Sequence, residues 1–135
     1  MSAASLDLRQ SPLASAKLVA FAATTNPARA KEFYGGVLGL RLVSQDGFAL
    51  VFEANGVTLR VSTVREVAQA QYMVLGWEVS DIAAAVKDME KAGVKFERYS
   101  FPGVDEMGIW TEPGGARVAW FKDPDGNILS VSQHP

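Results

Sequence analysis

The fold is decided by a stretch near the carboxyl end of the chain, Phe121-Lys122-Asp123-Pro124-Asp125-Gly126-Asn127-Ile128-Leu129-Ser130-Val131-Ser132-Gln133. Pro124 presets φ, Gly126 tolerates a positive φ, and the side chains of Asp125 and Asn127 can hydrogen-bond to nearby backbone. The first half of the stretch therefore predicts a tight turn. After the turn, Leu129 and Val131 alternate with two serines, which predicts a closing strand.

The closing strand has a counterpart earlier in the chain, Gly56-Val57-Thr58-Leu59-Arg60-Val61-Ser62. Two predicted helices repeat in the same way. Their N-cap residues, Asn26 and Asp81, lie 55 positions apart, and the glycines that end them, Gly39 and Gly93, lie 54 apart. A repeat of this length indicates two copies of one structural unit.

Each unit has the predicted order β-α-β-β-β. The first helix begins at Pro27 and buries Ala30, Phe33, Val37 and Leu38. The strands of the first unit are expected at residues 17–24, 40–44, 48–54 and 57–63. In the second unit, strands are expected at 72–79, 94–99, 108–111, 116–122 and 128–132, with a helix after Asp81, which is one strand more than the order β-α-β-β-β contains.

Composition narrows the class of protein. The 135 residues are 48% hydrophobic and 21% charged, with a net charge of −2, which fits one globular domain and gives no basic surface for nucleic acid or membrane. Residues 1–16 lack the pattern of a signal peptide and are expected to form a flexible arm, so we expect a cytoplasmic location. No cysteine is present, which excludes disulfides and thiolate chemistry.

Three segments together resemble the vicinal oxygen chelate superfamily of glyoxalases, bleomycin resistance proteins and dioxygenases. They are residues 26–40 (Asn26-Pro27…Phe33-Tyr34…Leu38-Gly39-Leu40), Val79-Ser80-Asp81-Ile82, and Asp123-Pro124-Asp125-Gly126-Asn127. The resemblance implies an α+β fold of two tandem βαβββ modules, residues 17–64 and 72–133, that form one curved eight-stranded sheet. It also implies a homodimer.

The resemblance further implies where a metal would be held in metal-dependent members, through His, Gln or Glu on the first and last strand of each module. The matching positions here are Val19, Arg60, Val74 and Ser130. Valine has no donor atom and arginine is a fixed cation. Catalytic zinc and non-haem iron both require several His or carboxylate ligands, whereas this chain has one histidine, His134. We therefore expect no metal and no cofactor, and the sequence argues against the usual glyoxalase I or extradiol dioxygenase activity.

Strand alternation predicts which side chains face the cavity of the sheet. Arg60 and Glu78 would be the two charges in a mostly apolar concavity that Phe21, Val19 and Val74 also line. They could form a salt bridge with each other. Alternatively, Arg60 would bind an anionic group of a ligand, and Glu78 would bind an amine or act as a general base. Both interpretations stay open at this stage.

The second module is rich in aromatic residues, most of which are expected in the core. Trp110 and Trp120 lie on late strands and would form a stacking wall if they face the cavity. Residues 100–107 form a longer loop, which we interpret as a possible lid.

Three functions are compatible with these features. The first is a metal-independent small-molecule-binding protein of the bleomycin-resistance type. The second is a glyoxalase-like or dioxygenase-like enzyme with an altered metal site. The third is a ligand-free structural homodimer. The ligand itself is not encoded in any motif of the sequence.

Overall fold

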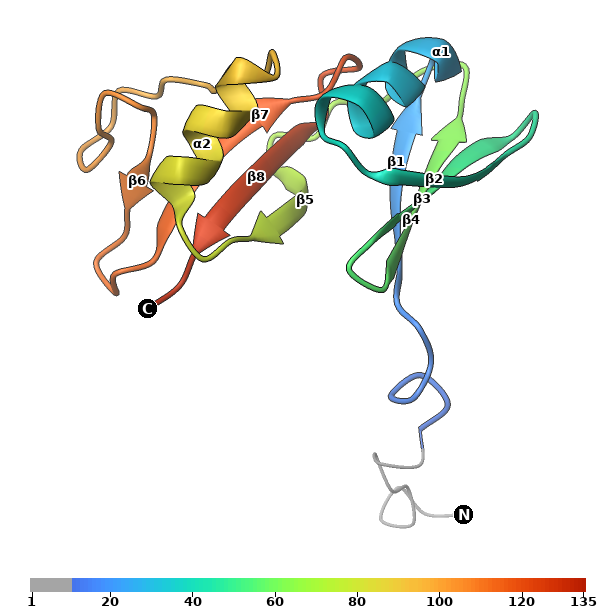
Figure 1. Cartoon of the computed structure of the whole chain (residues 1–135), viewed down its shortest axis with the longest axis horizontal. Coiled ribbons are helices and arrows are strands. Elements are labelled where there is room, and N and C mark those ends of the chain that lie inside the picture. Colours follow the sequence, from blue (N-terminus) through green and yellow to red (C-terminus); the bar gives the residue numbers. More distant parts are fainter. Residues whose placement is uncertain (1–10) are drawn as a thin grey trace.

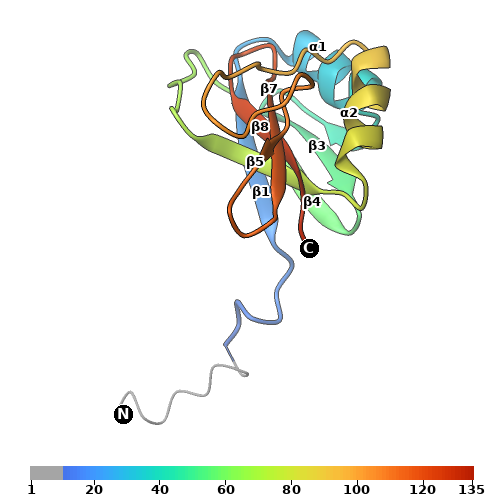
Figure 2. The same cartoon turned by 90° about the vertical axis from the view of Figure 1, so that its left-hand side faces the viewer.

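The computed structural model describes residues 11–135. The first ten residues of the predicted arm lie outside the described residues. Two four-stranded sheets stand side by side and meet at β1 and β5 (Figure 1). Both helical segments lie on the same side of the strands (Figure 2). Each sheet thus has a helix-covered face and an opposite face, which we call the open face.

The first sheet has the order β1-β4-β3-β2. Its strands are β1 (Val19–Thr24), β2 (Arg41–Gln45), β3 (Ala49–Ala54) and β4 (Val57–Thr63), with β1 parallel to β4. The turn between β3 and β4 is Asn55-Gly56, and both residues have positive φ, as a two-residue hairpin of this kind requires.

The second sheet has the order β5-β8-β7-β6, which repeats the topology of the first. Its strands are β5 (Met73–Glu78), β6 (Trp110–Thr111), β7 (Arg117–Lys122) and β8 (Ile128–Gln133). The helix α2 (Ile82–Lys91) is capped by Asp81, whose side chain accepts a hydrogen bond from the Ala84 amide. The α+β fold predicted from the sequence is confirmed, but the eight strands form two hydrogen-bonded sheets rather than one.

The predicted strand at residues 94–99 is wrong. Only Phe96 pairs with the sheet, through an isolated bridge to Phe121, and the Glu97 amide donates to the Trp120 carbonyl at 2.8 Å. After Glu97 the chain stops pairing with the sheet, so Tyr99 and Phe101 lie in a loop instead of a strand. The first predicted strand, residues 17–24, also begins later than expected, because β1 starts at Val19 and Leu18 is 75% exposed.

The first helix is not a regular α-helix. The short α1 (Pro27–Ala30) continues as a π-helix, η3 (Lys31–Val37), in which the Leu38 amide donates to the Phe33 carbonyl five residues back. The wider turn places Tyr34 in the core with 0% exposure. A strict 3.6-residue period had predicted Phe33 in that role, and Phe33 is only partly buried.

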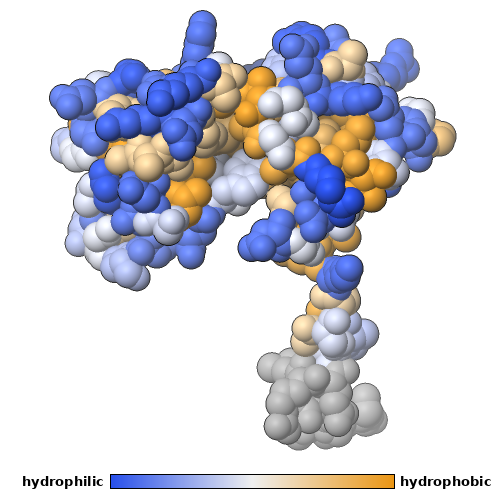
Figure 3. Space-filling model, viewed as in Figure 1, coloured by the Kyte–Doolittle hydropathy of each residue, from blue (hydrophilic) through white to orange (hydrophobic). Residues whose placement is uncertain are grey.

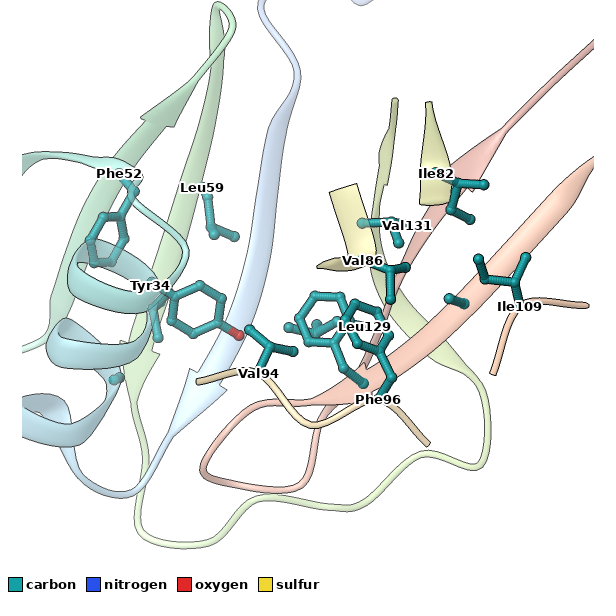
Figure 4. Packing of buried hydrophobic residues seen from close by; sticks show 14 of the residues in the cluster. Tyr34, Phe52, Leu59, Ile82, Val86, Val94, Phe96, Ile109, Leu129 and Val131 are labelled. Carbon is teal, nitrogen blue, oxygen red and sulfur yellow. The ribbon is translucent and has the colours of Figure 1, made fainter. Parts of the chain in front are cut away.

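The hydrophobic core lies between the strands and the helices and is continuous across both modules. Figure 4 shows Phe52 and Leu59 of the first sheet on one side, and Val86, Leu129 and Val131 of the second module on the other. The Tyr34 hydroxyl points from the first module toward the second in the same view. The two modules therefore share one core.

The turn at residues 123–127 joins the two modules. Buried Asp123 accepts hydrogen bonds from the Tyr34 hydroxyl at 2.6 Å and from the Asn127 side-chain amide at 2.7 Å. The Asn127 amide group also donates to the Ala23 carbonyl at the end of β1. Two of the segments that carry the family resemblance, residues 26–40 and 123–127, are thus in direct contact.

Asp125 makes a second set of contacts from this turn. Its carboxylate accepts hydrogen bonds from the Thr24 hydroxyl, the Thr25 amide and the Thr25 hydroxyl. Desolvation by itself would raise the pKa of Asp125, but these hydrogen bonds and the nearby Arg29 charge outweigh it, so the pKa lies below its usual value. The carboxylate form thereby favours the docked arrangement of the modules.

Candidate functional site

The open face of the first sheet carries Arg60 in the middle of a cross-strand row. Arg60 on β4 is aligned with Phe21 on β1 and Val51 on β3. Cross-strand partners project from the same face of a sheet, so the three side chains lie on one surface. Phe21 is 60% exposed and Val19, in the next row, is also exposed. Phe21 and Val51 thus flank Arg60 directly, and the next row of the same face holds Val19, Thr58, Glu53 and Arg41.

The open face of the second sheet carries Ser130 in the equivalent place. Ser130 on β8 is aligned with Gly76 on β5 and Trp120 on β7. A Cβ at position 76 would approach the Ser130 hydroxyl to 2.8 Å, so glycine leaves the room that the buried Ser130 occupies. The neighbouring row contains Glu78, Ser132, Val118 and Trp110.

Val74 departs from the predicted alternation. The register shifts between Met73 and Leu75, so Val74 is an extra residue opposite Ile128, as in a β-bulge. Val74 is partly exposed and lines a shallow hollow together with Phe21 and Asn127 at the junction of the two sheets. The position thus stays near the open face although the register changes.

Arg60 and Glu78 form no ion pair with each other within residues 11–135. They lie on different sheets, with β1 between Arg60 and the second module. The Glu78 side chain is 72% exposed, and its carboxylate lies 3.7 Å from Nε2 of His134. The interpretation of Arg60 and Glu78 as a salt bridge is therefore wrong. Glu78 is exposed and is not enclosed in a cavity with Arg60.

Four aromatic residues of the second module form a cluster on the open face. The Trp110 and Trp120 rings stack with centroids 6.2 Å apart, and Phe101 meets both edge-on at 5.8 and 6.0 Å. Tyr99 stacks on Phe101 and meets Trp120 edge-on. Tyr99 and Phe101 remain partly exposed. We call these four residues the aromatic wall.

The loop that bears Phe101 is held in place by its own side chains and by Trp110. The Asp105 carboxylate accepts hydrogen bonds from the amides of Met107 and Ile109, both at 2.9 Å. Gly103 has φ +92°, and a Cβ there would lie 3.1 Å from the Trp110 ring. Asp105 thus organises the loop, and Gly103 allows the loop to pass directly over Trp110.

From the sequence, most aromatic residues of the second module were expected in the core, and Tyr99 and Phe101 were not identified as members of the open-face cluster. The available signal was their position in the long loop between α2 and β6, because loops commonly carry binding residues. Trp110 and Trp120 could be named in advance as candidates, but their facing depends on a register that the sequence leaves undetermined.

The four positions at which the family resemblance implies metal ligands carry residues that do not fit a metal. They are Val19, Arg60, Val74 and Ser130, which supply no carboxylate or imidazole. Within residues 11–135, no three or more His, Cys, Asp and Glu residues are grouped as metal ligands would be. The donor set therefore differs from that of a catalytic zinc or iron centre. In the same described part of the chain, no helix is long and apolar enough to span a membrane.

The fold and the open face define a protein of two paired βαβββ modules. The chain belongs to the glyoxalase/bleomycin resistance protein/dioxygenase superfamily, since the model of that family matches residues 17–131. No curated protein sequence matches the chain significantly.

Solved structures with the same fold include enzymes. A putative glyoxalase family protein from Bacillus anthracis shares 14% identity at a TM-score of 0.68, over 89% of this chain and 95% of its own. A lactoylglutathione lyase from Agrobacterium tumefaciens shares 19% identity at a TM-score of 0.67, over 88% and 93%. The oxidase ChaP-H2 shares 23% identity at a TM-score of 0.63, over 89% and 94%. At these identities the similarity establishes the fold.

Proposed function

We propose that this protein binds a planar aromatic molecule with an anionic group on the open face, without a metal. The observation that carries the proposal is the placement of Arg60 between Phe21 and Val51, and of Ser130 beside Trp120 of the aromatic wall. Both residues stand at positions where the family resemblance implies a metal ligand. A fixed cation suits a carboxylate or phosphate. Stacked indole rings suit a planar ring.

The position of Arg60 supports an anionic ligand over a cationic one, because Arg60 lies between two apolar side chains and Glu53 in the next row is aligned with Arg41. Glu78 lies beside His134 at the end of β5, whereas Arg60 lies in the central row of its sheet. A ligand would therefore place its ring toward Trp120 and its acidic group toward Arg60. In this arrangement Arg60 replaces the charge that a metal ion supplies in other members of the superfamily.

The test is a calorimetric titration with 2-naphthoate, a planar aromatic carboxylate. Arg60→Ala should weaken binding by about 1.5–3 kcal/mol, the range for hydrogen bonds to charged groups. Trp120→Leu should cost about 0.5–1.5 kcal/mol through loss of stacking. Lys87→Ala is the matched control, because it removes one cation from exposed α2, on the opposite side of the sheets.

Two outcomes would overturn the proposal. Equal affinities for the wild type and Arg60→Ala would assign Arg60 to structure. Absence of saturable binding by the wild-type protein would favour the ligand-free structural protein that the sequence also allows.

We also propose that the protein is a homodimer and is located in the cytoplasm. The dimer is supported by a group of exposed apolar side chains at the junction of the sheets: Leu18, Val19, Phe21, Tyr72, Met73 and Val74. Apolar surface of this kind is stabilised by a partner. Sedimentation equilibrium should give a dimer for the wild type and a monomer for Phe21→Arg, and a monomeric wild type would contradict the dimer.

A further inference from the structure

A groove runs between the two modules on the helix-covered side, opposite the open face. Two apolar sections of about 390 Å³ each adjoin at Leu40 and Trp77, which line both. Figure 3 shows the hollow between the two halves of the molecule bordered by hydrophobic atoms. Volumes of this size are typical of small-molecule sites. We call it the inter-module groove.

The floor of the groove is built from large side chains that the core only partly covers. Leu40, Trp77 and Met89 pack against the core yet retain exposed surface. Trp77 lies against Phe121, with ring centroids 6.3 Å apart and planes at 26°. Each apolar surface left in contact with water is unfavourable, so an apolar occupant would be stabilised by covering it.

The charges along the groove have one sign. Asp88 lines the first section and Glu78 lines the second, and no lysine or arginine lines either section. Asp88 is exposed on α2 and forms no ion pair within residues 11–135. An apolar occupant with a basic group would therefore match both the walls and the rim.

We infer that the inter-module groove is a second ligand site, for a small hydrophobic amine. The apolar part lies over Trp77 and Leu40, and the ammonium group lies at the rim beside Asp88. The Trp77 side chain faces away from the open face, because it alternates with Gly76 and Glu78 along β5 and packs with the core. The first section of the groove is therefore separate from the open face, and the second section reaches Gly76 and Glu78 at the edge of that face. A ligand in it contacts both modules at once, so its binding depends on their docked arrangement.

The experiment compares octylamine, octanol and octanoate as probes, observed through the indole N–H signals of the three tryptophans in NMR spectra. Trp77→Phe assigns the groove signal. Octylamine should shift the Trp77 signal saturably and leave those of Trp110 and Trp120 unchanged, whereas 2-naphthoate at the open face should do the reverse. Failure of one site is thus distinguishable from failure of the other.

The charge requirement is tested with Asp88→Asn, an exposed substitution that leaves the core intact. It should weaken octylamine binding about two- to fivefold, as expected for one exposed ion pair, and leave octanol binding unchanged. Glu90→Gln is the matched control on the same helix, because Glu90 pairs with Arg98 outside the groove. The inference is overturned if octanoate binds as well as octylamine, if Asp88→Asn has no effect, or if no probe shifts Trp77.

Discussion

At the scale of single residues, Tyr34 and Asp123 carry the most information about this fold. Tyr34 is fully buried, Asp123 is 6% exposed, and their hydrogen bond spans 89 positions of sequence. Burial of the ring and the neighbouring carboxylate raise the pKa of Tyr34 far above its usual value, so the hydroxyl always has its proton to donate. The pair thus fixes the two modules in one arrangement.

We predict that Tyr34→Phe lowers the free energy of unfolding by about 1.5–3 kcal/mol, because it removes a hydrogen bond to a buried carboxylate. Urea denaturation measures the change. Tyr72→Phe, at an exposed position, is the control and should change stability by less than about 0.5 kcal/mol. Equal stability of Tyr34→Phe and wild type would show that the hydroxyl contributes nothing to docking.

A second residue-scale prediction concerns Asp125 and pH. Its pKa is depressed in the folded protein, so its carboxylate contributes stability above the unfolded pKa, and this contribution is lost as pH falls through the folded pKa. The stability difference between wild type and Asp125→Asn should therefore be largest near neutral pH and should shrink below about pH 4. Urea unfolding at pH 7 and pH 3 checks this, and a difference independent of pH would contradict it.

At the scale of elements, the π-helix η3 explains why sequence periodicity failed at one point. Asn26, Pro27 and Gly39 mark the ends of the helical segment as expected, and Asn26 accepts a hydrogen bond from the Arg29 amide. The extra residue in the turn at 31–37 then rotates the buried face, which places Tyr34 inward. Such a turn depends on tertiary contacts, here with Asp123, that no local pattern contains.

Three glycines of this segment should respond differently to alanine. Gly36→Ala should raise the free energy of unfolding by about 0.5–1 kcal/mol, since helical glycine is costly and a Cβ there meets only Glu32 at 4.0 Å. Gly35→Ala should gain less, because its Cβ would lie 3.4 Å from the Phe52 ring. Gly39→Ala should destabilise the protein, because φ is +75°. Thermal unfolding of the three variants would contradict this account if Gly39→Ala were the most stable.

The aromatic wall also separates features that adjacent residues determine from features that tertiary contacts determine. The turns Asn55-Gly56 and 123–127 and the cap Asp81 could be predicted because their chemistry depends on a few adjacent residues. Trp110 and Trp120 could be proposed as site residues from the sequence, but the face of the sheet to which they project could not be predicted. Tyr99 and Phe101 join them because the chain leaves the sheet after Glu97, a departure that the strand-like alternation of Val94-Lys95-Phe96-Glu97 does not reveal.

At the scale of the whole molecule, the repeat and the family resemblance predicted the paired modules. They left open where Arg60 and Glu78 lie relative to each other, because the two residues are on separate sheets whose relative placement depends on the turn at 123–127. The separation assigns Arg60 to the face and Glu78 to its exposed edge beside His134. The inter-module groove likewise exists only in the docked arrangement.

The most direct measurement is a calorimetric titration of 2-naphthoate into protein held in excess EDTA, repeated after dialysis against Zn²⁺, Ni²⁺ or Fe²⁺. If Arg60 and the aromatic wall form the site, binding is saturable in EDTA and its affinity is unchanged by any of the three metals. Tight stoichiometric binding of a metal, with naphthoate binding that appears only in its presence, would contradict the account and favour an enzyme with an altered metal site.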